Sequence, residues 1–149
     1  MLEPQSSVFW QTAVKSGLVN AQSLEACWEA VPPEKRTADT VDRRLARQVV
    51  NAGHLTLWQA QQLLSGRHAG LRIDRYVLQD LLGQGGMGRV YLALDTKLNR
   101  QVALKILSRE RLNNPRALAR FRREAKVGAQ LQHENLIRVY DEGESQGVR

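Results

Sequence analysis

Four glycines fall within the six residues from Gly83 to Gly88, in the spacing Gly83-x-Gly85-x-x-Gly88. Glycine has no side chain, so a glycine-rich backbone can approach an anion closely and present N–H groups to it. These residue types therefore suggest a loop that covers a phosphate group. Because such a loop is a weak indication by itself, its meaning depends on the elements on either side of it.

The residues after the glycines favour a strand, because "RVYLALD" contains Val90, Tyr91 and Leu92 in succession. With "YVLQDLLG" as the preceding strand, the glycines connect the two arms of a hairpin. A dinucleotide-binding fingerprint requires a helix directly after its last glycine, and a Walker loop requires Gly-Lys followed by Ser or Thr. This sequence meets neither requirement.

Lys105 and Glu124 are two charges at positions where apolar residues are expected. Lys105 lies in "QVALKIL", which alternates as a strand does. Asn114 and Pro115 can begin a following helix, on which Glu124 lies on the same side as Phe121. A half-buried charge needs a partner, so we expect an ion pair between the lysine and the glutamate. In the alternative interpretation, the glutamate is exposed beside the arginines of its own helix.

Residues 73–149 resemble the N-terminal lobe of a bacterial serine/threonine protein kinase. The resemblance rests on "LGQGGMGRVY", "VALK", "RFRREA" and "HENLIRVYDEGE", in this order and spacing. It implies a partial kinase lobe with an antiparallel sheet and one helix. Together with the small helical segment predicted before it, this lobe gives the chain an α+β fold. The resemblance also implies ATP and Mg²⁺ as cofactors and a protein Ser or Thr as the phosphoryl acceptor.

The resemblance assigns a role to each residue of a nucleotide site. The glycines would cover the ATP phosphates, Lys105 would contact the α- and β-phosphates, and Glu124 would hold that lysine in place. Leu82, Val90 and Ala103 would line the adenine slot. The cofactor-binding residues implied in this way are Leu82, Gly83, Gln84, Gly85, Gly86, Met87, Gly88, Val90, Ala103, Lys105 and Glu124.

The family's catalytic residues have no match in these 149 residues. Protein kinases use an H-R-D-x-x-x-x-N loop and a D-F-G motif, which supply the catalytic Asp and the Mg²⁺ ligands. None of His54, His68 and His133 precedes Arg-Asp, and D-F-G does not occur. We therefore expect a kinase fragment that does not transfer phosphate by itself. The alternatives are a regulatory or protein-interaction module derived from a kinase, and a nucleic-acid binder that uses the basic residues 109–126.

The family's sheet places its strands in the order first, second, third, fifth, fourth, and the sequence offers candidates for the first four. The strand at 101–107 is then expected to keep an unpaired edge, which invites pairing with a second chain. We therefore expect residues 73–149 to be loosely ordered or self-associating. Residues 1–70 are expected to be the more autonomous unit.

Residues 1–70 are predicted to form a helical N-terminal extension with three tryptophans, Trp10, Trp28 and Trp58, as core anchors. "SGLVNAQS" and "AGHLTLWQ" repeat at an offset of 36 residues, each with a helix stop, a glycine, an apolar residue and a capping residue. Any two helix-glycine-helix joints could look alike in this way. Four helices are expected. The first covers 9–16, and the second begins near 20 and ends at the prolines at 32 and 33. The third contains the apolar positions 41, 45 and 49, and the fourth runs from a capping box at 56 and 59 to 64.

The net charge of +7 is concentrated in the second half. Residues 1–70 contain seven basic and six acidic residues, whereas residues 71–149 contain fifteen and nine. No aromatic residues for base stacking are interleaved with the basic cluster at 109–126, which favours a solvated helix face over nucleic-acid binding.

The single cysteine, Cys27, excludes an intrachain disulfide. With no signal peptide or apolar run of membrane length, we expect a cytoplasmic protein with no membrane segment.

Overall fold

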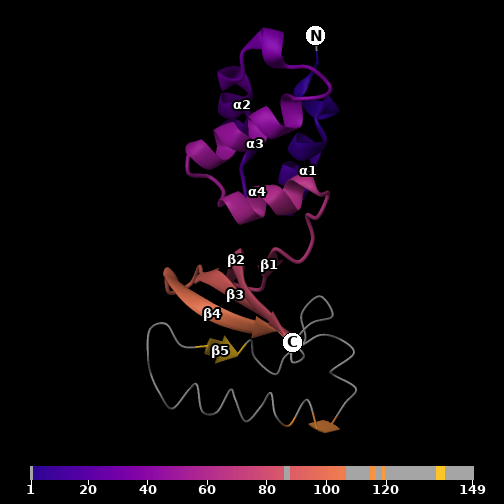
Figure 1. Cartoon of the computed structure of the whole chain (residues 1–149). Coiled ribbons are helices and arrows are strands. Elements are labelled where there is room, and N and C mark those ends of the chain that lie inside the picture. Colours follow the sequence, from indigo (N-terminus) through magenta and orange to yellow (C-terminus); the bar gives the residue numbers. More distant parts are fainter. Residues whose placement is uncertain (1, 86–87, 107–114, 117–118, 120–136, 140–149) are drawn as a thin grey trace. The chain divides into compact units, whose positions relative to one another are not determined.

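The structure is a computed structural model, and it describes residues 2–85, 88–106, 115, 116, 119 and 137–139. The chain divides into two compact units, Met1–Leu71 and Arg72–Arg149. The first unit is helical, and the second is built on a sheet (Figure 1). No helix among the described residues is long and apolar enough to cross a membrane.

The first unit contains the four helices that the sequence predicts, with their expected caps. The Asn20 side chain accepts a hydrogen bond from the Ser23 N–H group, and Thr56 and Gln59 form the complete capping box. These bonds satisfy N–H groups that have no partner within the helix. The elements are η1 Pro4–Ser6, α1 Val8–Ser16, α2 Ala21–Ala30, η2 Pro33–Lys35, α3 Val41–Asn51 and α4 Leu57–Leu64.

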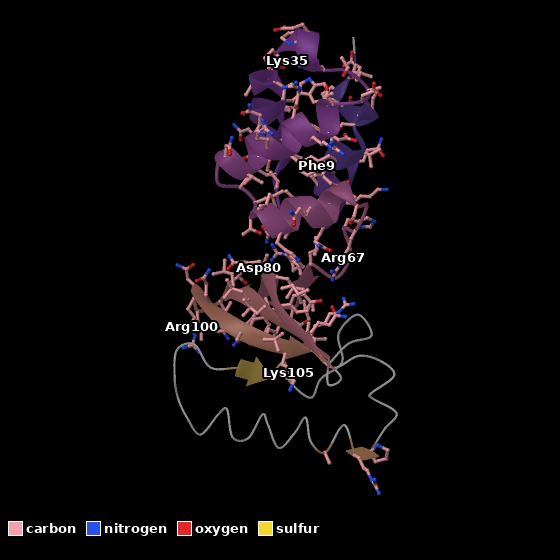
Figure 2. All side chains as sticks on the ribbon, in the orientation of Figure 1. Phe9, Lys35, Arg67, Asp80, Arg100 and Lys105 are labelled. Carbon is pink, nitrogen blue, oxygen red and sulfur yellow. The ribbon has the colours of Figure 1, made fainter. Side chains whose placement is uncertain are left out.

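An apolar core holds the four helices together. The Phe9 side chain lies within the bundle (Figure 2) and is fully buried, as are Leu24 and Leu45. Trp10 and Trp28 pack edge to face with ring centroids 6.3 Å apart, a favourable arrangement for aromatic rings. Both tryptophans are buried, which confirms them as core anchors, whereas Trp58 is only partly buried against the core.

The two helix joints predicted to repeat at an offset of 36 residues share one backbone geometry. Gly17 and Gly53 both adopt positive φ angles, 71° and 81°, which favour glycine. Val19 and Leu55, two residues further on, are both buried. The capping residues that follow have nearly equal φ and ψ angles, −77° and 158° in the first joint and −76° and 161° in the second. The joint between α1 and α2 and the joint between α3 and α4 therefore repeat one local geometry, and α1–α2 and α3–α4 are called the first and the second helical hairpin.

The second unit contains a five-stranded sheet in the order β1-β2-β3-β4-β5. Neighbouring strands from β1 to β4 are antiparallel, and this part confirms the strands predicted around the glycines. With the helices of the first unit, the sheet gives the chain the α+β composition that the sequence predicts. The strands are β1 Arg72–Ile73, β2 Tyr76–Gly85, β3 Gly88–Asp95, β4 Arg100–Ile106 and β5 Ile137–Val139.

Strand β5 lies at the edge of β4, where the sequence led us to expect an unpaired edge. β5 runs parallel to β4 and pairs along it from Ala103 to Lys105. The expectation of an open edge is therefore wrong at these three residues, because edge N–H and C=O groups form hydrogen bonds with any strand that reaches them in a suitable direction. Self-association through this edge stays a prediction.

Candidate functional site

The antiparallel register places the glycine-rich hairpin next to Lys105. Gly83 of β2 pairs with Val90 of β3, and Val90 pairs in turn with Lys105 of β4. Two residues along β3, Leu92 pairs with Ala103. Because directly paired residues project to the same side of a sheet, these positions share one face. This face brings together four of the residues that the sequence assigns to a nucleotide site.

Lys105 extends from β4 (Figure 2) and is only 8% exposed. Burial lowers the pKa of its ammonium group, because the charged form loses hydration. The lysine stands in the middle of a buried stretch from Val102 to Ile106. A charge at such a position is stabilised by an anion close to it, and a phosphate group is one such anion.

The hairpin leaves open space beside its first glycine. A Cβ atom built on Gly83 would meet no atom within 4 Å. The pairing of β2 with β3 shifts between Leu81 and Gly83, so Leu82 falls at the irregularity and is 55% exposed. At the start of β3, Gly88 has a φ angle of 126°, a conformation that other residues rarely adopt. The backbone conformation therefore favours glycine at position 88, and the hairpin leaves open space beside Gly83.

The opposite face of the sheet is apolar and holds the three strands in place. Leu78, Tyr91, Ala93 and Leu104 are buried there, with Tyr91 paired to Leu104 across the ladder. Apolar residues on this face alternate along β3 with less buried residues, such as Val90 and Leu92, that project to the side of Lys105. A change of register by one residue would exchange the two faces, so the buried face fixes the position of the site.

Asp95 stabilises the turn between β3 and β4. Its carboxylate accepts hydrogen bonds from the N–H groups of Lys97 and Leu98 and lies 3.1 Å from the Nε atom of Arg75. Burial alone would raise the pKa of this carboxyl group, but the two backbone hydrogen bonds and the charges of Arg75 and Arg100 lower it overall. The ionised carboxylate therefore connects the turn between β3 and β4 to Arg75, which lies between β1 and β2.

The described residues include most of the predicted site. Gly83, Gln84 and Gly85 lie at the end of β2, and Gln84 and Gly85 pair with Arg89 and Gly88 of β3. Gly86, Met87 and Glu124 lie outside the described residues, as does the helix expected around Glu124, so the ion pair of this glutamate with Lys105 stays a prediction.

Leu92 projects to the same side of the sheet as Val90 and Lys105, but the assignment from the sequence did not include it. It pairs with Ala103 and follows Val90 by two residues. Residues two apart on a strand project to the same side, and this alternation could have identified it. Groups of three or more His, Cys, Asp or Glu side chains suited to a metal ion are absent from the part of the chain that the structure describes.

The second half of the chain is similar to known proteins. Residues 76–147 match the protein kinase domain family. Serine/threonine-protein kinase PksC of Streptomyces coelicolor is 49% identical over 81 residues, which are 53% of this chain and 15% of that kinase. Serine/threonine-protein kinase PknB of Mycobacterium leprae is 48% identical over 73 residues, 49% of this chain and 12% of that kinase. The PknI kinase domain of Mycobacterium tuberculosis has a TM-score of 0.38 at 34% identity, over 54% of this chain and 32% of that one.

The matched segment, residues 76–147, is thus similar to the protein kinase family. Within that family, its similar relatives are bacterial serine/threonine kinases, as the sequence predicts. The whole chain spans only a small part of the length of these relatives, 15% of PksC and 12% of PknB.

Proposed function

We propose that the second unit is the ATP-binding lobe of a serine/threonine protein kinase. The observation that supports this most strongly is the row of Gly83, Val90 and Lys105 across three neighbouring strands. The row combines open space beside a glycine backbone with a buried cation on one face of the sheet. A polyphosphate needs these two features, and the apolar positions beside them suit a flat base.

Each residue has a proposed part in holding the nucleotide. The glycines from Gly83 to Gly88 would cover the phosphates, and Lys105 would contact the α- and β-phosphates. Leu82, Val90 and Ala103 would line the adenine slot, with Glu124 as the partner that orients the lysine. Phosphates near Lys105 would also form charge-assisted hydrogen bonds with its ammonium group.

The reaction of the whole protein is part of this proposal. Bound ATP supplies the γ-phosphoryl group, which protein kinases transfer to a Ser or Thr hydroxyl with the aid of Mg²⁺. The residues of this chain would bind and orient the nucleotide, with the lysine and glycines fixing the phosphate chain. The catalytic Asp and the Mg²⁺ ligands of the family have no match in the 149 residues. A polypeptide of this sequence is therefore expected to bind ATP weakly and to transfer no phosphate.

A titration with a fluorescent ATP analogue tests the proposed site. Lys105→Met is expected to weaken binding by about tenfold, which corresponds to loss of a charge-assisted contact worth about 1.4 kcal/mol. Lys97→Met is the matched control, because Lys97 is exposed in the turn between β3 and β4 and should leave binding unchanged. Equal binding by the wild type and the two variants would contradict the proposed site.

A further inference from the structure

A shallow apolar groove lies between α3 and α4 of the helical unit, which stand next to each other (Figure 1). Its volume is about 230 Å³. Ala46 and Ala60 are buried at the groove, whereas Leu57 is 64% exposed and Leu64 is 38% exposed. The volume is below the roughly 300–1,000 Å³ of small-molecule pockets, so the groove is better suited to a few side chains of another protein.

The comparison of the two helical hairpins explains why the second has a groove. At the offset of 36 residues, Ala46 and Leu64 correspond to Trp10 and Trp28 of the first hairpin. In the first hairpin, the two tryptophan rings pack against each other between α1 and α2. The smaller side chains of the second hairpin leave space at the corresponding positions. The groove thus lies where the first hairpin carries its pair of tryptophan rings.

Two arginines make the groove basic on its α3 side. Arg43 and Arg47 are one helical turn apart, both are exposed, and both line the groove. Within the described residues neither side chain forms an ion pair or a hydrogen bond. The carboxylate of Asp42, the acidic residue of α3, already accepts hydrogen bonds from the Ser7 hydroxyl and the Phe9 N–H group. The basic charge beside the groove is therefore free to meet a partner.

We propose that this groove binds an amphipathic helix of an acidic partner protein. Apolar side chains of the partner, spaced along one helix face, would fill the space between Leu57 and Leu64, and acidic residues on its flank would pair with Arg43 and Arg47. A second copy of this chain is a poorer occupant, because two such grooves would bring four arginines together. The basic segment 109–126 is disfavoured for the same reason.

Two labelled peptides of about 14 residues provide the test, used with the full 149-residue chain. Both are designed as amphipathic helices with the same leucine face, and they differ in carrying glutamate or lysine on the flank. The glutamate peptide is expected to bind at least about tenfold more tightly than the lysine peptide at low salt. The double variant R43E/R47E should reverse this preference, because it changes the sign of the charge beside the groove.

Two further variants test the apolar part of the groove. Leu57→Asp should weaken binding of the glutamate peptide by about tenfold, because it places a charge among the partner's apolar side chains. Leu64→Trp copies the residue of the first hairpin and should weaken binding by filling the groove. Val14→Asp is the matched control, since Val14 is 50% exposed on α1, outside the groove, and should leave affinity unchanged.

Several outcomes would overturn the proposal. These are equal binding of the two peptides, no binding of the glutamate peptide at about 1 mM, the weak end of measurable affinity, or an equal loss of affinity in Val14→Asp. Binding of the chain to phosphatidylserine vesicles, when it depends on Leu57 and the two arginines, would assign the groove to a membrane surface instead. Circular dichroism of each variant confirms that the helices are intact, so a loss of binding cannot be attributed to unfolding.

Discussion

Arg36 is predicted to be the polar side chain whose removal most weakens the C-terminal end of α2. Its guanidinium group donates hydrogen bonds to the carbonyl oxygens of Trp28 and Val31, at 3.1 and 3.0 Å. Its Cζ atom also lies 5.3 Å from the centroid of a Trp28 ring, and only 7% of the side chain is exposed. The last carbonyls of a helix have no partner within it, so this arginine acts as a C-terminal cap.

The magnitude follows from these contacts. Two hydrogen bonds from a charged donor contribute about 1–1.5 kcal/mol each, and the contact with the tryptophan ring adds about 0.5–1 kcal/mol. The ion pair with Glu29 adds little, because the glutamate side chain is 78% exposed and the separation is 3.9 Å. Arg36→Ala is therefore expected to lower the free energy of unfolding of the helical unit by about 2.5–4 kcal/mol. Arg36→Lys should lose part of this, because an ammonium group cannot reproduce the planar geometry of the guanidinium.

Urea denaturation followed by tryptophan fluorescence measures this effect in the full chain. All three tryptophans lie in the first unit, so their emission reports on its unfolding and not on the sheet. Lys15→Ala is a suitable control, because Lys15 is exposed on α1. A loss below about 0.5 kcal/mol for Arg36→Ala, the range of ordinary surface substitutions, would refute the assignment of Arg36 as a cap.

Three other outcomes are expected. Asp42→Ala should lower the free energy of unfolding of the helical unit by about 1–3 kcal/mol in the same assay, because it removes the acceptor that joins α3 to the start of α1. The lowered pKa of Asp95 means that its ionised form is favoured by folding, so the stability it provides is present above pH ~4 and is lost as the pH falls below that value. The protection factors of the two amides that donate to it, which are intrinsic exchange rates divided by the observed rates at each pH, should therefore fall on acidification. In Asp95→Asn they should already be low at neutral pH and change little on acidification. Gly83→Ala should leave the circular dichroism spectrum unchanged, because a Cβ atom meets nothing there, yet weaken binding of the ATP analogue by about threefold or more if phosphates approach that backbone.

The local features of both units could be predicted from the sequence, because the responsible residues are close together in it. The capping residues Asn20 and Thr56 act on N–H groups three positions away. The alternation along β4 fixes which of its residues share a face, and the kinase resemblance assigned Lys105 and Val90 to one site, whose register the structure then shows. These short-range signals do not depend on how distant segments meet.

The features that could not be predicted join residues far apart in the sequence. Asp42 accepts hydrogen bonds from residues 33 and 35 positions earlier, which no local pattern indicates. The pairing of β5 with β4 depends on which strand reaches an available edge, and the alternation of apolar residues gives no information on that choice. The α3–α4 groove depends on the size of side chains that meet across two helices, so it emerges only once their packing is known.

The most direct test of the proposed nucleotide site is the identity of the lysine that lies beside bound phosphates. An acyl phosphate derivative of ATP transfers its acyl group to a nearby lysine amine and releases ATP, and mass spectrometry of peptides then locates the acylated residue. Lys105 is predicted to be labelled preferentially, and an excess of ATP should prevent that labelling. Labelling of the exposed Lys97 and Lys15 to the same extent, without protection by ATP, would contradict the site that we assign to this sheet.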